Sequence, residues 1–255
     1  MKNKARRFAG AVYRIIIPIV DPIKLIFVFP GYFSYLVDLV KYSLKRGSEG
    51  IHFLDLHPVI GQNTSTTSFD PQYFYQGIWA FNKIKASQTQ EHTDVGSQIN
   101  LIGFLTGITS VKFVDIRPLE AELSNFTMIK GSILSLPFSD NSISSLSCLH
   151  VAEHIGLGRY GDPLDPNGTV KACRELARVL APGGNLYFSL PVGKSRVCFN
   201  AHRVHSPMQI LDYFKDLDLV EFSGVNDIGK LMKKASPKDF ESCEYSLGLF
   251  HFTKK

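Results

Sequence analysis

From Thr93 onward, short runs rich in β-branched and aromatic residues alternate with longer runs whose apolar positions recur every three or four residues. The first pattern is typical of strands and the second of amphipathic helices, and their alternation predicts parallel βαβ units. We therefore expect an α/β domain with a mostly parallel sheet, an antiparallel last strand and helices on both faces. The seven predicted strands are Thr93–Val95, Val111–Val114, Phe126–Lys130, Ile143–Leu149, Leu186–Leu190, Leu219–Phe222 and Tyr245–Phe252.

Helical segments connect these strands. Ile99–Ile108 follows the first strand, and Thr169–Leu180 carries apolar side chains at i, i+3, i+4 and i+7 counted from Cys173. That spacing gives the second helix one face to bury, and it stops at an Ala-Pro-Gly-Gly sequence. A third helix is expected to start with Ser206 as its N-cap and to run to about Leu217.

Residues 1–69 lack this alternation and are predicted to form an extension of the α/β domain, which covers residues 70–255. The polar loop Gly61–Ser68 separates the two parts. An Asp-Pro pair at residues 70–71 is typical of a helix start, and aromatic residues follow on more than one face. We expect a buried helix here, running to about Phe81.

The apolar stretch Ala11–Val40 raises the question of a membrane span. Three charged residues in it would each cost about 2.5–3.5 kcal/mol at a bilayer centre, and three prolines are expected to break a helix. The longest charge-free run, Leu25–Val37, has 13 residues, which is too short to span. The charged residues are Arg14, Asp21 and Lys24, and the prolines are Pro18, Pro22 and Pro30. We expect neither a spanning helix nor a signal peptide.

Composition is that of a globular protein, with 255 residues, 44% hydrophobic and 20% charged. The net charge is +5, and much of the surplus lies in two terminal clusters, so no nucleic-acid surface is indicated. The clusters are Lys2, Lys4, Arg6, Arg7 and Lys254, Lys255. Four widely spaced cysteines form no C-x-x-C pair, which favours reduced thiols in a cytosolic protein over a zinc knuckle or a disulfide framework.

The basic, apolar N-terminus allows two interpretations. It can be a helical cap over the core, which we prefer, or a peripheral anchor on an anionic membrane surface. The expected location is cytoplasmic, with the inner face of the membrane as the alternative.

Polar residues directly after the first two strands are candidate ligand contacts, because ligands of doubly wound sheets bind outside the carboxyl ends of the strands. Gly96 permits a tight turn against a ligand, and Asp115 lies about 20 residues further on, where ribose hydroxyls are bound. Asp94 can orient the turn or reach a cofactor. Ordinary strand-end carboxylates remain the alternative for both aspartates.

Two later segments, Gly131–Ile143 and Glu175–Gly184, resemble the "GDAxxLPFxDxSFD" and "ExxRVLKPGG" motifs of class I S-adenosylmethionine (SAM) methyltransferases. The resemblance implies a Rossmann-like fold with SAM as cofactor, an adenine contact in the first segment and a structural role for the second.

A more specific resemblance, covering roughly Tyr73 to Asp227, is to the DUF268 family, a methyltransferase-like group of unassigned activity that is often associated with surface-polysaccharide biosynthesis. It is carried above all by the sequences EHIGLGRYGD and FNAHRV. The segments concerned are Asp94–Ser97, Val114–Pro118, Leu146–Pro163 and Phe199–Val204.

The resemblance implies a set of cofactor contacts at the strand ends. The methyltransferase pattern D-x-G-x-G-x-G keeps only Gly96, with Gln98 and Asn100 at the later glycine positions, and Ser132 replaces the usual Asp of the adenine contact. The expected contacts are Asp94, Val95, Gly96, Ser97, Asp115, Ile116, Arg117, Gly131, Ser132, Ile133, Leu149 and His150.

His150, Glu153 and His154 form the sequence H-x-x-E-H, which on a long helix can bind zinc. The glycines that follow leave no room for that helix, so a zinc hydrolase is a remote alternative and no metal site is expected. Two other interpretations remain. Glu153 and His154 can be a structural pair that holds the loop after the fourth strand, or His154 or His150 can be a general base that the neighbouring carboxylate orients. His202 is a rival base.

Several polar residues on the same loops are candidates for holding the acceptor, since a guanidinium binds phosphate through two hydrogen bonds. An alternative role for these residues is to hold their own Gly-rich loop through polar contacts. Asp162 and Asp165 can also bind a divalent metal beside the acceptor. The acceptor candidates are Arg159, Tyr160, Asp162, Asn200 and Arg203.

These observations predict an O-methyltransferase that uses SAM to methylate a hydroxyl of a small-molecule or lipid-linked glycan acceptor. A cofactor- or partner-binding protein that has lost catalysis is the alternative. The sequence leaves the acceptor, the oligomeric state and the identity of the base open.

Overall fold

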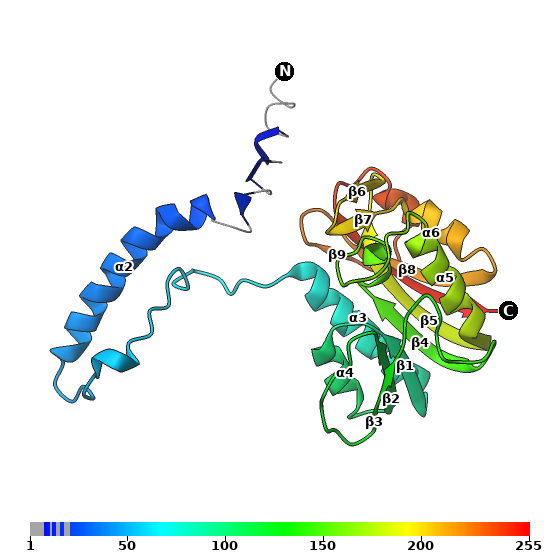
Figure 1. Cartoon of the computed structure of the whole chain (residues 1–255), viewed down its shortest axis with the longest axis horizontal. Helices are drawn as coiled ribbons and strands as arrows, with labels where there is room; N and C mark the ends of the chain where they lie inside the picture. The colour runs from blue at the N-terminus through cyan, green and yellow to red at the C-terminus, as the bar shows by residue number, and fades with distance from the viewer. Residues whose placement is uncertain (1–7, 11, 14–15, 18–20) are drawn as a thin grey trace. The chain divides into compact units, whose positions relative to one another are not determined.

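The computed structural model describes residues 8–10, 12–13, 16–17 and 21–255, and it divides into two compact units, residues 1–68 and 69–255. The basic cluster Lys2–Arg7 and the expected helix-breaking Pro18 lie outside the described residues. Figure 1 shows the helical N-terminal segment and the α/β unit; each is described by itself.

From residue 21 onward, where the structure describes it without a gap, the N-terminal unit contains a long helix, α2 (Pro22–Ser43), and a short 3-10 turn, η1 (Phe53–Asp55). The expectation that Pro30 breaks the helix is wrong, because α2 continues through it for 22 residues. Proline lacks an N–H and removes one backbone hydrogen bond, and the turns on either side of Pro30 continue despite that loss. Gly31 packs against Ile60, whose Cγ2 lies 2.1 Å from the place where a Cβ would be.

The α/β unit is built on an eight-stranded sheet in the order β3-β2-β1-β4-β5-β10-β8-β9 (Figure 1). The first five strands in that order are parallel, and β10 runs antiparallel to both of its neighbours. The strands are β1 (Glu91–Val95), β2 (Ser110–Asp115), β3 (Phe126–Lys130), β4 (Ile143–Leu149), β5 (Leu180–Val192), β8 (Leu217–Val225), β9 (Leu231–Met232) and β10 (Ser246–Lys254). The predicted seven strands and the antiparallel last strand are confirmed, and β9 adds a two-residue edge.

Helices cover both faces of the sheet, as predicted. One apolar core lies under α3 (Pro71–Ser87) and α4 (Ile99–Leu105), and the other lies under α5 (Gly168–Val179) and α6 (Pro207–Tyr213). The apolar face of α5 is buried at Cys173 and Leu176, which confirms the predicted spacing.

Helix α3 starts where the sequence predicts but is not buried. The Asp70 carboxylate accepts hydrogen bonds from the N–H groups of Gln72 and Tyr73, at 2.8 and 3.2 Å. Only Gln76, Ala80 and Ile84 are buried, because α3 packs on the sheet with one face. Tyr73 and Phe74 are exposed, and the other aromatic residues of α3 are partly buried against the core.

Several boundaries differ from the expectation, and short elements that the sequence did not predict are present. Strand β5 begins at Leu180, six residues before the predicted Leu186, because the Ala-Pro-Gly-Gly segment is already extended. Helix α6 ends at Tyr213. A small antiparallel pair, β6 (Arg196–Cys198) and β7 (His202–Val204), follows β5, and a 3-10 turn, η2 (Ala152–His154), follows β4.

Candidate functional site

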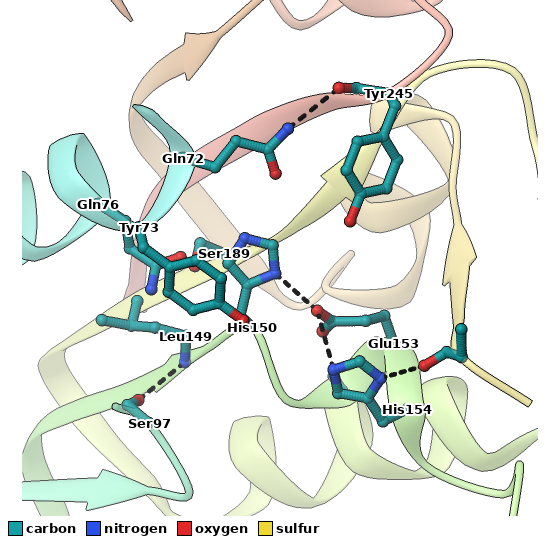
Figure 2. Close-up of polar contacts among 12 residues, drawn as sticks. Gln72, Tyr73, Gln76, Ser97, Leu149, His150, Glu153, His154, Ser189 and Tyr245 are labelled. Atoms are coloured by element: carbon teal, nitrogen blue, oxygen red, sulfur yellow. Dashed lines mark hydrogen bonds and ion pairs between the residues drawn. The ribbon is translucent and has the colours of Figure 1, made fainter. Parts of the chain in front are cut away.

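The turn after β1 is held by buried hydrogen bonds. Asp94 is fully buried, and its Oδ1 accepts a hydrogen bond from the Ser97 N–H at 2.9 Å while its Oδ2 accepts one from the Ser147 hydroxyl on β4. The Ser97 hydroxyl accepts from the Leu149 N–H at 3.0 Å (Figure 2). Burial raises the pKa of Asp94 to about 6, although these hydrogen bonds oppose the shift. The Asp94 side chain therefore orients the turn from within the sheet.

A cavity of about 350 Å³ lies at the carboxyl ends of β1 to β4. Gly96 forms part of its wall with φ +70°, a conformation that favours glycine. A Cβ at Gly96 would lie 3.2 Å from Val151 and 3.8 Å from Asp115 Oδ2, so the main chain, the Asp115 carboxylate and the loop after β4 meet closely here. The walls are Val95, Gly96, Val114, Asp115, Ile116, Arg117, Gly131, Ser132, Ile133, Leu134, His150, Val151, His154, Ile155, Tyr160, Gly161, Asp162 and Pro163.

Two carboxylates line this cavity, that of Asp162 and that of Asp115, which ends β2. Asp115 Oδ1 accepts a hydrogen bond from the Arg117 N–H at 2.7 Å, and the Asp115 side chain is mostly covered. The Arg117 guanidinium lies over the Tyr160 ring, 4.6 Å from its centroid. Ser132 accepts a hydrogen bond from the Leu134 N–H at 3.2 Å. The cavity thus combines two carboxylates with otherwise mostly apolar and main-chain walls.

His150 and Glu153 form a buried pair beside this cavity (Figure 2). His150 Nδ1 lies 2.7 Å from Glu153 Oε1, while the buried His150 Nε2 and Glu153 Oε2 have no hydrogen-bond partner among the residues that the structure describes. Burial opposes ionisation of Glu153, but the charges of His150 and His154 and the hydrogen bond from His150 outweigh it and lower its pKa. Glu153 Oε1 accepts a hydrogen bond from the Nδ1–H group of His150, which leaves Nε2 as the ring nitrogen that an acceptor can meet.

Both ring nitrogens of His154 lie close to oxygen atoms of other residues. Its Nδ1 lies 2.6 Å from the carbonyl oxygen of Ala201 and must donate to it, and its Nε2 faces Glu153 Oε1 at 3.6 Å. Both ring nitrogens therefore face acceptors (Figure 2), so His154 leaves no ring nitrogen open to an acceptor hydroxyl.

The Tyr73 ring, from helix α3, stacks on His150 with ring centroids 4.8 Å apart. Tyr73 also lines a second cavity of about 750 Å³ between α3 and α4. The walls of this second cavity, called here the α3–α4 groove, are mostly apolar and include the exposed side chains of Phe74, Ile78 and Phe104. Tyr73 thus joins the groove to the His150–Glu153 pair.

The family model described as "Caenorhabditis protein of unknown function, DUF268" matches residues 99–244 of this chain. The chain belongs to the DUF268 family. No curated protein matches the chain.

Solved structures show the fold of this DUF268 protein. The N-methyltransferase NodS from Bradyrhizobium japonicum WM9, solved with S-adenosyl-L-homocysteine (SAH), is similar with a TM-score of 0.52 and 15% identity, over 72% of this chain and 88% of NodS. A candidate sarcosine dimethylglycine methyltransferase from Galdieria sulphuraria is similar with a TM-score of 0.52 and 15% identity, over 71% and 85% of the two chains. The DUF268 unit therefore has the Rossmann-like class I methyltransferase fold that the sequence predicts.

Most of the predicted cofactor residues of this DUF268 protein do line the cavity. Asp94, Ser97 and Leu149 do not, because they hold the turn from within. The predicted residues that line it are Val95, Gly96, Asp115, Ile116, Arg117, Gly131, Ser132, Ile133 and His150, together with His154, Tyr160 and Asp162.

Arg203 is placed where it cannot serve the predicted acceptor role. It is 6% exposed, and its guanidinium donates to the carbonyl oxygens of Ile155 and Asp165 at 2.5 and 3.0 Å. Arg203 is therefore bound to carbonyl groups of the loop after β4, and these hydrogen bonds stabilise that loop. Arg159 similarly donates to the Ala201 carbonyl at 3.0 Å.

Three further predicted residues lie around this loop region. Asp162 accepts from the N–H groups of Gly156 and Tyr160 and shapes its own turn. His202 lies against Tyr245, with ring centroids 5.0 Å apart, and burial lowers its pKa. Asn200 is exposed and lines neither cavity.

The H-x-x-E-H sequence does not form a zinc-binding helix. His150 follows β4, and Glu153 and His154 lie on the three-residue turn η2, with both imidazoles directed at Glu153. In the part of the chain that the structure describes, no group of three His, Cys, Asp or Glu side chains is placed to hold a metal ion.

Proposed function

We propose that this protein is a SAM-dependent O-methyltransferase that acts on a hydroxyl of a sugar or glycan acceptor in surface-polysaccharide biosynthesis. The observation that carries the proposal is the cavity at the strand ends, which presents the Asp115 carboxylate at one side and the His150–Glu153 pair at the other. The acceptor class follows from the DUF268 association stated above.

The cavity fits the cofactor in size and chemistry. A close main-chain approach at Gly96 suits the amino-acid part, the Asp115 carboxylate suits the ribose hydroxyls, and the segment Gly131–Ile133 with its apolar neighbours suits the adenine. Bound there, SAM would supply an electrophilic methyl group on a sulfonium. NodS, which has the same fold, is solved with SAH.

The chain's own contribution to the reaction is to position the acceptor and to remove its proton. His150 Nε2 takes the proton of the acceptor hydroxyl as the oxygen gains its methyl group. His150 then becomes an imidazolium, and Glu153 stabilises it by accepting the hydrogen bond from its Nδ1–H group. The buried Nε2 without a partner supports this role, since a buried polar atom is costly until a ligand supplies its hydrogen bond. In-line placement supplies much of the remaining rate enhancement.

The α3–α4 groove favours the lipid-linked form of the acceptor over a small free sugar. It is apolar, it is large enough for part of an alkyl or prenyl chain, and Tyr73 joins it to His150. An acceptor that combines an apolar chain in the groove with a hydroxyl at His150 would use both features.

The alternative is a protein that binds a cofactor or a partner without catalysis, and Gln98, Asn100 and Ser132 favour it because they replace the usual cofactor-binding residues. Incubation with methyl-labelled SAM and extracted lipid-linked glycans separates the two functions. We expect label in the organic phase, from which mild acid releases it with the glycan. Protein that binds SAH and transfers no label would contradict the enzymatic proposal.

A further inference from the structure

Helix α2 exposes a continuous apolar surface. At 3.6 residues per turn, Leu25, Phe29, Phe33, Leu36 and Val40 recur along one side of the helix. All five are exposed, and Phe29 and Phe33 are 76% and 72% exposed. Leaving such side chains in water forgoes roughly 1.5–3 kcal/mol each, so this surface needs a partner.

The opposite side of α2, called here the polar side, carries charged and small residues beside Phe27 and Tyr35, and it is partly covered. Lys24, Gly31, Ser34 and Asp38 lie on this side, and Ile60 of the same unit packs against Gly31. The chain that follows α2 thus contacts the helix on its polar side and leaves the apolar side free.

The length and charges of α2 distinguish between crossing a bilayer and lying on it. Lys24–Ser43 has 20 residues and is apolar enough to cross a membrane by length and composition. However, the charge-free run between Lys24 and Asp38 has 13 residues, about 20 Å at 1.5 Å per residue, against a hydrocarbon core of about 30 Å. Since both charges lie on the side opposite Phe29 and Phe33, the helix matches an interfacial position.

The charge distribution along the chain matches an anionic surface. Residues 1–49 contain nine Lys or Arg and three Asp or Glu, whereas the whole chain contains 28 and 23. The positive surplus of the protein therefore lies in the segment that contains α2. Basic residues next to an apolar helix are attracted by anionic lipids.

We propose that α2 is an amphipathic anchor that lies in the surface of an anionic lipid bilayer, with Leu25, Phe29, Phe33, Leu36 and Val40 in the acyl region and Lys24 and Asp38 toward water. The anchor holds the enzyme at a membrane. The anchor proposal rests on α2 and on the basic residues on either side of it, and it does not depend on the methyltransferase proposal.

Flotation of the full chain with preformed vesicles tests the anchor. Vesicles of phosphatidylcholine with about one-quarter phosphatidylglycerol should carry the protein upward, and vesicles of pure phosphatidylcholine should carry clearly less. Phe33→Glu should lower the bound fraction at least about tenfold, because it places a charge in the acyl region. Ser34→Glu adds the same charge on the polar side and should lower binding by less than about twofold.

Each other outcome contradicts the anchor. Absence of flotation, or equal binding of the two variants, would show that the apolar side of α2 does not meet lipid. Protein that stays with the vesicles in alkaline carbonate would show a spanning helix in place of a surface one. Circular dichroism of both variants checks that they are folded, and SAH binding checks the α/β unit separately.

Discussion

Two polar clusters flank the strand ends, and they differ in how completely their atoms are paired. In the Asp94–Ser97–Ser147 cluster, both carboxylate oxygens have partners. In the His150–Glu153 pair, one buried atom of each side chain has none within the described part of the chain. A paired buried network stabilises a structure, whereas an unpaired buried atom is costly and is kept where a ligand completes it. The first cluster thus orients the turn, and the second is the better candidate for chemistry.

The largest effect is expected at His150. His150 has φ +57°, which asparagine tolerates better than alanine, so His150→Asn removes the base with little backbone strain. We expect turnover to fall by about 10²–10⁴-fold, while the Kd for SAH changes far less, because proton removal and cofactor binding are separate contributions. Label transfer and calorimetry measure the two quantities.

His202→Asn is the matched control for this experiment. His202 lies against Tyr245 and does not line the cofactor cavity, so the variant should lose less than about tenfold in turnover. If His202→Asn abolished turnover and His150→Asn did not, the base would be His202 and the contrast between the two clusters would fail.

A smaller effect, on stability, is expected at Asp94. Its pKa in the folded protein is about 6, above its ordinary 3.8, because burial disfavours the charged form. The folded state therefore binds the proton more tightly than the unfolded state, and this contribution to stability is present below about pH 4 and lost as the pH rises through about 6. The loss amounts to about 3 kcal/mol.

Urea unfolding at pH 4 and pH 7 measures this dependence. The wild type should lose about 3 kcal/mol more than Asp94→Asn between the two pH values, since the variant has no carboxyl to titrate there. Equal losses in both proteins would mean that Asp94 is not the buried, pH-sensitive group of the turn.

The smallest effect concerns the acceptor and the α3–α4 groove. Gly77 lines the groove, and a Cβ there would meet no atom within 4 Å, so Gly77→Leu fills the groove without a clash at Cβ. We expect KM for the lipid-linked acceptor to rise about tenfold, the effect of displacing a short apolar segment, with SAH affinity unchanged. Gly103→Leu, on α4 outside the groove walls, is the matched control and should leave KM unchanged. An equal KM in both variants would exclude the groove from acceptor binding.

The sheet was predictable because its signals are local. Strand ends such as Asp115 and the apolar spacing around Cys173 are visible in short windows of sequence, and the structure confirms both. The continuity of α2 through Pro30 was not predictable, because proline usually breaks a helix. Here the hydrogen-bonded turns on either side of Pro30 keep the helix continuous. The β6–β7 pair has three residues in each strand and leaves no recognisable pattern.

Residues that line the cavity were predictable mainly where they follow a strand or lie on the loop after β4. Gly96, Asp115 and His150 were found in this way, and they line the cavity. Tyr73 was missed, since its contact with His150 joins positions 77 residues apart in the sequence. Arg203 resembles a phosphate ligand in sequence, and only its contacts with the carbonyls of Ile155 and Asp165 show that it braces a loop.

Calorimetry with SAH tests the central claim most directly, because it requires no acceptor. We expect one-to-one binding by the wild type and binding at least about tenfold weaker in Asp115→Ala, which removes the carboxylate that would hold the ribose hydroxyls. Absence of binding by folded wild-type protein, or equal affinity in the variant, would contradict the assignment of this cavity to SAM.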